Sequence, residues 1–141
     1  VGVVQGRTIK HPLLEFVSLV LPPLAAGNSV VAVADPAHPL GALLVAESAP
    51  TADIPAGALN VLTGVAAELS PWIASHRDVD AVHALVEPDQ ATVLRAGAAE
   101  NLKRVCVLPS DEDFSDDERW SSPRRMEPFV EIKTIWHPSG A

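Results

Sequence analysis

Few side chains in this chain are suited to nucleophilic catalysis, and Cys106 is the only thiol. It lies in the apolar run RVCVL, between Val105 and Val107, with no histidine or asparagine near it in the sequence. Because burial in apolar surroundings raises the pKa of a thiol and keeps it protonated, this position predicts an inert cysteine of the core. We therefore assign no catalytic role to Cys106.

The histidines and paired charges form no pattern typical of a metal or acid–base site. Asp78 and Asp80, in RDVDAV, have a spacing compatible with acid–base chemistry, but turn contacts before a strand explain them more simply. Arg124 and Arg125 could bind an anion, although ion pairs with the nearby acidic run are favoured. No metal site is expected, because the histidines lack spacings such as HExxH; they are His11, His38, His76, His83 and His137.

Short apolar runs alternate with helical segments along most of the chain. Each run lacks in/out alternation, which is typical of strands buried on both faces; the expected strands are 1–4, 29–34, 58–62, 81–86 and 104–108. The expected helices are 12–26, 39–48, 66–76 and 88–101, and Pro12, Pro39 and Pro88 lie in the first turns of three of them. This order predicts an α/β fold with a doubly wound, Rossmann-like parallel sheet.

Composition limits the classes of protein to which the chain can belong. Its 141 residues suit a single domain, and the net charge of −8 argues against nucleic-acid binding. The longest apolar stretch, 12–26, contains Glu15 and the internal pair Pro22 and Pro23, so it is too short and too broken to span a bilayer. A single cysteine fits a reducing, cytoplasmic location. The start at Val1 rather than methionine suggests a chain cut from something longer.

Three regions are expected: a Rossmann-like domain at 1–108, an acidic linker at 109–128 and a C-terminal strand region at 129–141. The linker has no apolar periodicity and is rich in charge, serine and proline. The run FVEIKTIW, from Phe129 to Trp136, alternates like a half-exposed strand. Such a strand can add to a sheet of another subunit or form an edge of its own sheet, and both alternatives stay open.

With these elements placed, the sequence resembles the aldehyde dehydrogenase superfamily. The segments HPLLEF, PLAAGNSVV, ALNVLTG, SHRDVDAV and AAENLKRV follow one another in the family's order and spacing over the first 108 residues. EIKTIWHPSG is similar to the family's C-terminal oligomerisation strand. The strongest likeness is to the degenerate second module of two-module, family-sixteen aldehyde dehydrogenases. The resemblance implies the fold of an NAD-binding domain.

The chain departs from the family where the family does its chemistry. The resemblance places Lys10 where active members have the asparagine that donates to the oxyanion, and Val33 where they have the lysine that holds the adenosine ribose. Glu87 falls within the family's Gly-Ser-Thr turn beside the diphosphate, and Leu108 replaces the general-base glutamate. The chain passes from Leu108 to the acidic linker, without the catalytic domain and its nucleophilic cysteine.

The expected cofactor edge also lacks the groups that bind a dinucleotide. Residues 24–39 predict a helix that closes on Gly27, a strand and a loop, but the loop carries no lysine, serine or glycine-rich turn. Glu87 and Asp89 open the helix near Pro88, where each carboxylate stabilises the helix end by about 0.3–1 kcal/mol and repels a diphosphate. We therefore expect no cofactor-binding residue, although NAD is the family's cofactor.

The leading hypothesis is a catalytically inactive aldehyde dehydrogenase-like module with a structural or oligomerisation role. Its expected partner is a second copy of the chain or an upstream aldehyde dehydrogenase module, contacted through Phe129 to Trp136. The alternative is a functional, NAD-binding aldehyde dehydrogenase.

Overall fold

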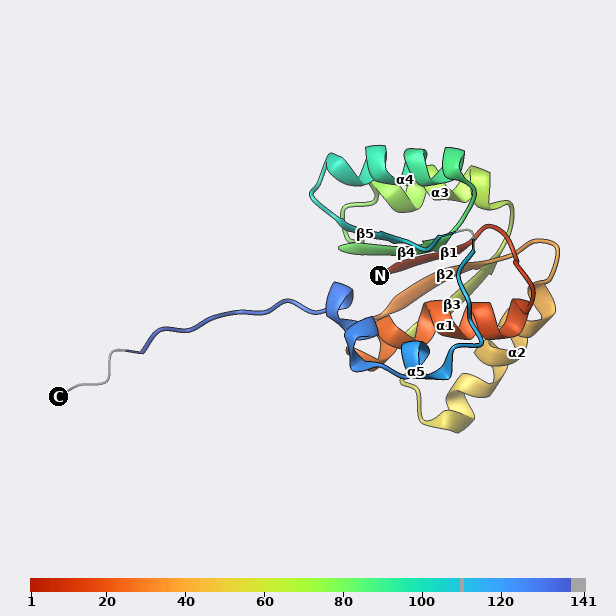
Figure 1. Ribbon diagram of the computed structural model, residues 1–141, viewed down its shortest axis with the longest axis horizontal. Helices are drawn as coiled ribbons and strands as arrows, with labels where there is room; N and C mark the ends of the chain where they lie inside the picture. Colours follow the sequence, from red (N-terminus) through yellow and green to blue (C-terminus); the bar gives the residue numbers. More distant parts are fainter. Residues whose placement is uncertain (110, 138–141) are drawn as a thin grey trace.

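The computed structural model describes residues 1–109 and 111–137. Five parallel strands form one sheet in the order β3-β2-β1-β4-β5 (Figure 1). The strands are β1 (Gly2–Gln5), β2 (Val30–Ala34), β3 (Leu59–Thr63), β4 (Ala81–Leu85) and β5 (Arg104–Val107). The predicted α/β fold with a doubly wound parallel sheet is confirmed.

Two pairs of helices cover the two faces of the sheet (Figure 1). Helices α1 (Pro12–Ala25) and α2 (Pro39–Ser48) lie on one face, and α3 (Ala66–Ser75) and α4 (Pro88–Ala99) lie on the other. A short 3-10 helix, η1 (Ala49–Ala52), follows α2. Helices α1, α2 and α4 begin at prolines, as predicted, because a first-turn N–H has no partner within the helix to lose. Gly27 has a φ of 84°, which suits its place after α1. None of the helices in the described residues is long and apolar enough to cross a membrane.

The two central strands are buried on both faces. Every residue of β1 and β4 is buried, whereas β3 and β5, at the sheet edges, are partly exposed. One apolar cluster joins Val3 and Phe16 beneath α1, and a second joins Val4 and Leu94 beneath α4. The runs at 1–4 and 81–86 therefore correspond to strands without a solvent face, whereas the prediction of burial on both faces is wrong for β3 and β5, which lie at the sheet edges.

The chain reverses its winding direction between β1 and β4. Strands β2 and β3 lie on one side of β1, while β4 and β5 lie on the other side. At such a switch point the connections leave the carboxyl ends of the two neighbouring strands in opposite directions, and ligands of α/β proteins bind in the crevice between them. The loops after Gln5 and Leu85 are therefore the first place to look for a site.

Residues 111–129 are folded against the domain, so the expected linker at 109–128 is not a free tether. A short helix, α5 (Asp117–Trp120), and a 3-10 helix, η2 (Pro123–Phe129), pack beside α1 (Figure 1). Phe114 and Phe129 are each 5% exposed, and Phe114 belongs to the apolar cluster beneath α1. We call residues 111–129 the cap. Ser110 lies outside the described residues.

The expected C-terminal strand does not form within the described chain. Phe129 ends η2 instead, because its ring packs against His83, with ring centroids 5.1 Å apart. Residues 130–137, which we call the tail, are extended and run away from the body (Figure 1). The alternative of an edge strand in the chain's own sheet is therefore wrong for the described residues, whereas addition to another chain stays a prediction. Residues 138–141 of the expected third region lie outside the described residues.

Candidate functional site

The carboxyl edge of the sheet brings together the loops that follow β1, β2 and β4. The loop after β1 leads to the first turn of α1, and the loop after β4 leads to the first turn of α4. Helix N-termini carry unpaired N–H groups and a positive dipole end, so they are natural sites for the phosphates of a nucleotide. The groups that surround these two helix ends decide what the edge can bind.

Glu15 occupies the N-terminus of α1. Its side chain is buried and accepts hydrogen bonds from the backbone N–H groups of Ile9 (3.0 and 3.1 Å), Lys10 (2.7 Å) and His11 (2.8 Å). His11, at the N-cap, makes no side-chain cap of its own. The N–H groups of Ile9, Lys10 and His11, which lead into this helix, are therefore bonded to an internal carboxylate, whose negative charge lies where a phosphate would approach.

Sequence reasoning missed this role of Glu15, which it treated only as an interruption of an apolar stretch. The available signal was an acidic side chain in the first turn of a helix that begins with proline. Lys10, at the position of the family's oxyanion donor, has an exposed side chain, while its backbone N–H is one of the bonds to Glu15.

The N-terminus of α4 is flanked by an ion pair across the switch point. Glu87 is the N-cap residue of α4 and makes no side-chain cap; its carboxylate lies 2.9 Å from the Arg7 guanidinium, in the loop after β1. Pro88 contributes no N–H, and Asp89 adds a second acidic side chain. The predicted acidic start of this helix is present, but the Glu87 side chain forms an ion pair with Arg7 and does not cap the helix.

Gln90 fills the space next to this ion pair. Its Oε1 atom lies 2.8 Å from the point that a Cβ atom on Gly6 would occupy, so the amide rests on the backbone just after β1. That oxygen is buried and has no hydrogen-bond partner among the described residues. Together with Glu15, Glu87 and Asp89, it surrounds the two helix ends with carboxylates and an acceptor oxygen, which is electrostatically unfavourable for a diphosphate.

Asp35 closes the loop after β2. It is 5% exposed and accepts hydrogen bonds from Thr8 Oγ1 (2.5 Å), the Ala37 N–H (3.0 Å) and His38 Nδ1 (3.0 Å). Burial by itself raises the pKa of this carboxyl group, but the hydrogen bonds from His38, Thr8 and Ala37 outweigh burial and hold the pKa below its usual value. Val33, where the family has its ribose-binding lysine, is completely buried in the core.

Cys106 lies beside His83, a neighbour that sequence reasoning missed. The two residues are register partners in the parallel strands β5 and β4, which only the sheet alignment reveals. His83 Nδ1 lies 2.9 Å from the Leu19 carbonyl oxygen, which makes it the protonated nitrogen of a neutral ring. Burial lowers the pKa of His83 to about 4 and raises the pKa of Cys106. A neutral imidazole bonded to the backbone does not stabilise a thiolate, so the geometry favours the inert role expected for Cys106.

The remaining candidate residues are apart from this edge. The backbone oxygen of Asp80 accepts from the Arg104 N–H at 3.1 Å, and the Asp78 N–H donates to His76 Nδ1 at 3.3 Å, which are turn and strand contacts as expected. Among the described residues, no group of three or more His, Cys, Asp or Glu side chains could hold a metal ion. His137 is exposed in the tail.

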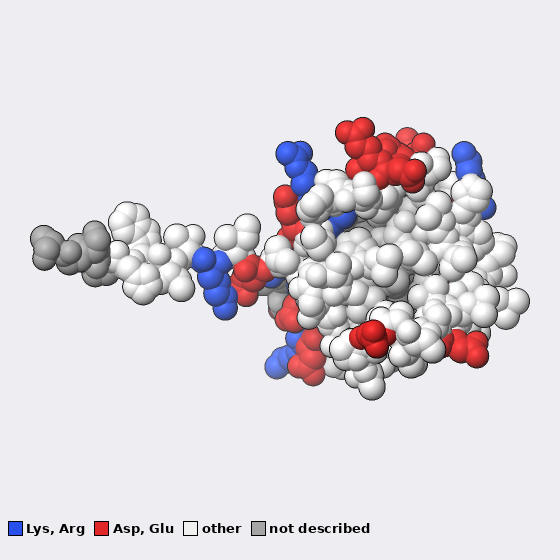
Figure 2. Space-filling view, turned by 90° about the horizontal axis from the view of Figure 1, so that it is seen from below, with Lys and Arg blue, Asp and Glu red and all other residues white. Residues whose placement is uncertain are grey.

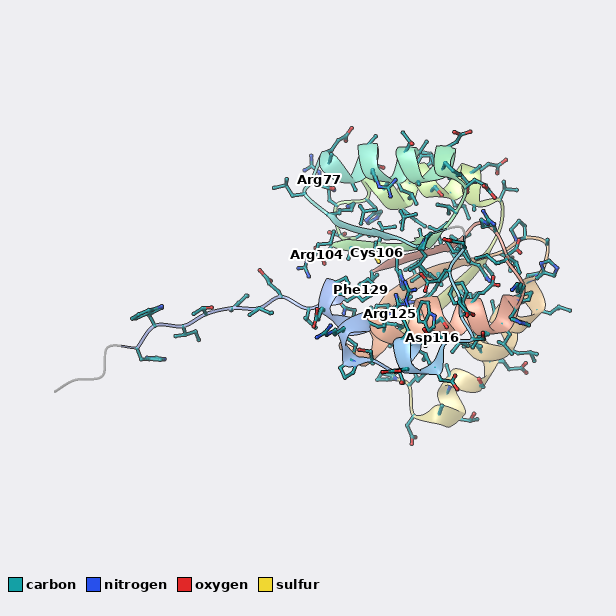
Figure 3. The ribbon with its side chains drawn as sticks, viewed as in Figure 1. Arg77, Arg104, Cys106, Asp116, Arg125 and Phe129 are labelled. Atoms are coloured by element: carbon teal, nitrogen blue, oxygen red, sulfur yellow. The ribbon has the colours of Figure 1, made fainter. Side chains whose placement is uncertain are left out.

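Arg125 pairs with the acidic run, as expected, through Glu112 of the cap. The Glu112 side chain is completely buried and lies 3.1 Å from Arg125 and 2.9 Å from Arg119. Arg125 is labelled in Figure 3. Its guanidinium also lies over the Trp120 ring, 3.8 Å from the ring centroid. The cap is therefore held by a buried charge cluster and an aromatic contact, which leaves Arg125 occupied rather than free to bind an anion.

Comparisons with known proteins agree with the fold. The Aldehyde dehydrogenase family model matches residues 10–109. The chain is 38% identical over 110 residues to Aldehyde dehydrogenase family 2 member C4 of Arabidopsis thaliana, covering 76% of this chain and 22% of that protein. It is 39% identical over 118 residues to Aldehyde dehydrogenase 9 of Polyandrocarpa misakiensis, covering 75% of this chain and 52% of that protein.

Solved structures give the same result. The apo structure of indole-3-acetaldehyde dehydrogenase superposes with a TM-score of 0.67 and 36% identity, covering 75% of this chain and 24% of that chain. An NADP dependent enzyme of E. coli superposes with a TM-score of 0.69 and 26% identity, covering 75% of this chain and 22% of that chain. The chain thus spans about a fifth to a half of the length of these proteins.

Replacing Glu15 tests the hydrogen bonds that its carboxylate accepts before the first turn of α1. We expect Glu15→Gln to lower the free energy of unfolding by about 1–3 kcal/mol, because an amide cannot accept all the N–H bonds that the carboxylate holds. Urea denaturation monitored by circular dichroism measures the change. Glu47→Gln, on an exposed position of α2, is the matched control and should change stability by less than about 0.5 kcal/mol. Equal effects of the two substitutions would contradict the structural role of Glu15.

His83 makes stability depend on pH. Because its folded-state pKa of about 4 lies below the ordinary value of 6.5, the unfolded chain binds the extra proton first as the pH falls. The stability contribution is therefore complete above pH 6.5 and is lost between pH 6.5 and 4, by an amount of about 3 kcal/mol. We expect His83→Asn, which keeps a donor toward Leu19, to reduce the loss of stability between pH 7 and pH 4.5 in urea titrations. An unchanged pH dependence would refute this assignment.

Proposed function

The chain belongs to the aldehyde dehydrogenase family, and on this premise we propose that it is a non-catalytic module of that family with a structural, assembly role in a larger enzyme. The observation that carries the proposal is the presence of carboxylates at both helix ends of the switch point. Glu15 takes the N–H groups before α1, and the Arg7–Glu87 pair flanks α4. Groups that could bind an anion are here bonded to side chains of the same chain. Such an arrangement keeps the fold of a nucleotide-binding domain without requiring a nucleotide.

The positions that the family uses for chemistry support the same conclusion. Lys10, Val33 and Leu108 stand where active members have their oxyanion donor, ribose-binding lysine and general base. Val33 and Leu108 are buried, so neither is available to a ligand. These departures resemble the degenerate second module of the two-module, family-sixteen enzymes, in which a partner module would carry out NAD-dependent aldehyde oxidation.

The assembly role rests on the tail. Its large apolar side chains are uncovered in the single chain: Ile132 is 87% exposed, Ile135 74% and Trp136 91%. Such a run is costly to leave in water and indicates a protein contact. The proposed partner is a second copy of the chain or an upstream aldehyde dehydrogenase module.

A nucleotide titration separates this function from that of a working NAD-binding subunit. We expect NAD to leave the tryptophan fluorescence and the calorimetric heat unchanged up to millimolar concentration, because carboxylates stand at both helix ends where the phosphates would lie. Binding in the micromolar range would overturn the non-catalytic proposal. A catalytically active aldehyde dehydrogenase in the same buffer provides the positive control.

Removal of the tail tests the assembly role. We expect the full chain to scatter light as a multiple of 14.8 kDa and a chain without residues 131–141 to scatter as a monomer. The cut leaves Phe129 and the cap in place, so the body stays folded. A truncated chain of unchanged mass would remove the tail from the assembly.

A further inference from the structure

A hollow lies between helix α1 and the cap, and we propose that it binds a small apolar molecule carrying one hydroxyl group, such as a phenol. Figure 1 shows the cap beside α1, and the hollow between them has a volume of about 270 Å³. The family model ends at residue 109, so the cap wall lies outside the part of the chain that this model matches. The site is separate from the tail and goes beyond the proposed assembly role.

Apolar side chains form most of the wall of the hollow. The cap contributes Trp120, Pro123 and Met126. Trp120 is fixed by Phe114, since the two rings stack with their centroids 4.9 Å apart. Small-molecule sites are typically concave and apolar with a few polar groups, and an apolar cavity of about 150 Å³ is enough to bind benzene. The facing wall is one stripe of α1, formed by Val17, Ser18, Leu21, Pro22 and Ala25.

Ser18 brings a hydroxyl group without a partner to this hollow. The residue is 8% exposed and lines the hollow from α1. Among residues 1–109 and 111–137, its hydroxyl forms no hydrogen bond, whereas the other buried serine, Ser70, donates to the Ala66 carbonyl oxygen at 2.6 Å. A buried hydroxyl without a partner costs free energy, and a ligand oxygen that accepts its proton would recover that cost.

The carbonyl group of Ser18 is released from the helix as well. In an unbroken helix it would accept from the N–H four residues later, but Pro22 stands there and has no N–H. Pro23 releases the Leu19 carbonyl in the same way, and His83 Nδ1 donates to that oxygen at 2.9 Å. No side chain of the described residues does this for Ser18. One ligand hydroxyl can both donate to this carbonyl and accept from the Ser18 hydroxyl, which indicates an alcohol or a phenol.

The charge of Arg125 at the hollow favours a neutral ligand over an anion. Arg125 lines the hollow, but a nitrogen of its guanidinium lies 3.1 Å from a carboxylate oxygen of the buried Glu112. A carboxylate on the ligand would compete with Glu112 for this guanidinium and leave a buried charge without one of its two partners. A neutral hydroxyl compound leaves the pair intact.

The single methionine of the chain gives a direct measurement of binding. Isotope labelling of the methionine methyl group yields one NMR signal, because Met126 is the only methionine, and this residue lies in the wall of the hollow. We expect p-cresol to shift the signal saturably with a Kd of about 0.1–1 mM. We expect p-xylene, which has the same shape without the hydroxyl group, to bind about 3–10-fold more weakly. The indole N–H signals of Trp72 and Trp136, which are 74% and 91% exposed, should stay in place as internal controls.

Ser18→Ala tests the polar recognition without changing the apolar wall. The substitution removes the unpartnered hydroxyl, so we expect it to lower the preference for p-cresol over p-xylene at least twofold. Ser70→Ala is the matched control, because Ser70 is also a buried helical serine but lies in α3, on the opposite face of the sheet. The control should keep the preference of the parent chain, and circular dichroism shows whether each variant is folded.

Val17→Phe tests the position of the ligand in the parent fold. Val17 lines the hollow from α1, so a larger side chain there should weaken the binding of both probes at least tenfold. Val93→Phe, at a position of α4 that is 44% exposed, is the matched control and should bind both probes like the parent chain. Equal binding by Val17→Phe and the parent chain would overturn the hollow as the site.

The remaining outcomes separate the parts of the proposal. A Met126 signal that p-cresol does not move, or that moves without saturation together with those of Trp72 and Trp136, overturns the site. Equal Kd values for the two probes, or a preference that survives Ser18→Ala, overturn the recognition of a hydroxyl group. The chain without residues 131–141 should bind p-cresol like the full chain, whatever its mass. Loss of binding in that chain would place the ligand on the tail and overturn the hollow, while the assembly role is decided by the mass alone.

Discussion

The position of β1 between β2 and β4, with water on neither face, is the constraint on which the rest of the molecule depends. A parallel strand buried on both sides requires helices above and below the sheet, and right-handed connections place α1 and α2 on one face and α3 and α4 on the other. The same geometry brings the first turns of α1 and α4 to the carboxyl edge. The fold therefore creates two positive helix ends whether or not a ligand is bound, and their donors must be satisfied.

This chain has a buried carboxylate at the N-terminus of α1 and a second one in the cap that packs beside α1. Glu15 at α1 and Glu112 in the cap are buried carboxylates of the same kind, one held by backbone N–H groups and the other by Arg119 and Arg125. A buried charge is tolerated only when its partners are complete, so each carboxylate fixes the segment that supplies them. The face of the molecule seen in Figure 2 has a broad area without Lys, Arg, Asp or Glu. On α1, Leu13 is 47% exposed and Leu14 41%.

The sequence predicted the elements that repeat a simple physical pattern. The buried strands and the helices that start at prolines lie within a few residues of their predicted bounds, because apolar runs and proline positions are local signals. The cap was taken for a linker because its packing depends on a few aromatic and charged residues, such as Phe114 and Glu112, rather than on a period. The proximity of His83 and Cys106 depends on the register of two strands, and no local pattern encodes it.

The tail shows where a local pattern is correct and still insufficient. Its alternation is that of a strand, but a strand exists only when a neighbour pairs with it, and the tail leads away from the body beyond the contact between Arg104 and Val130. In the described tail, Ile132, Ile135 and Trp136 are mostly exposed, so these apolar side chains are uncovered in the single chain. The carboxylates at the two helix ends and the exposed apolar tail are the features on which the proposed assembly role rests.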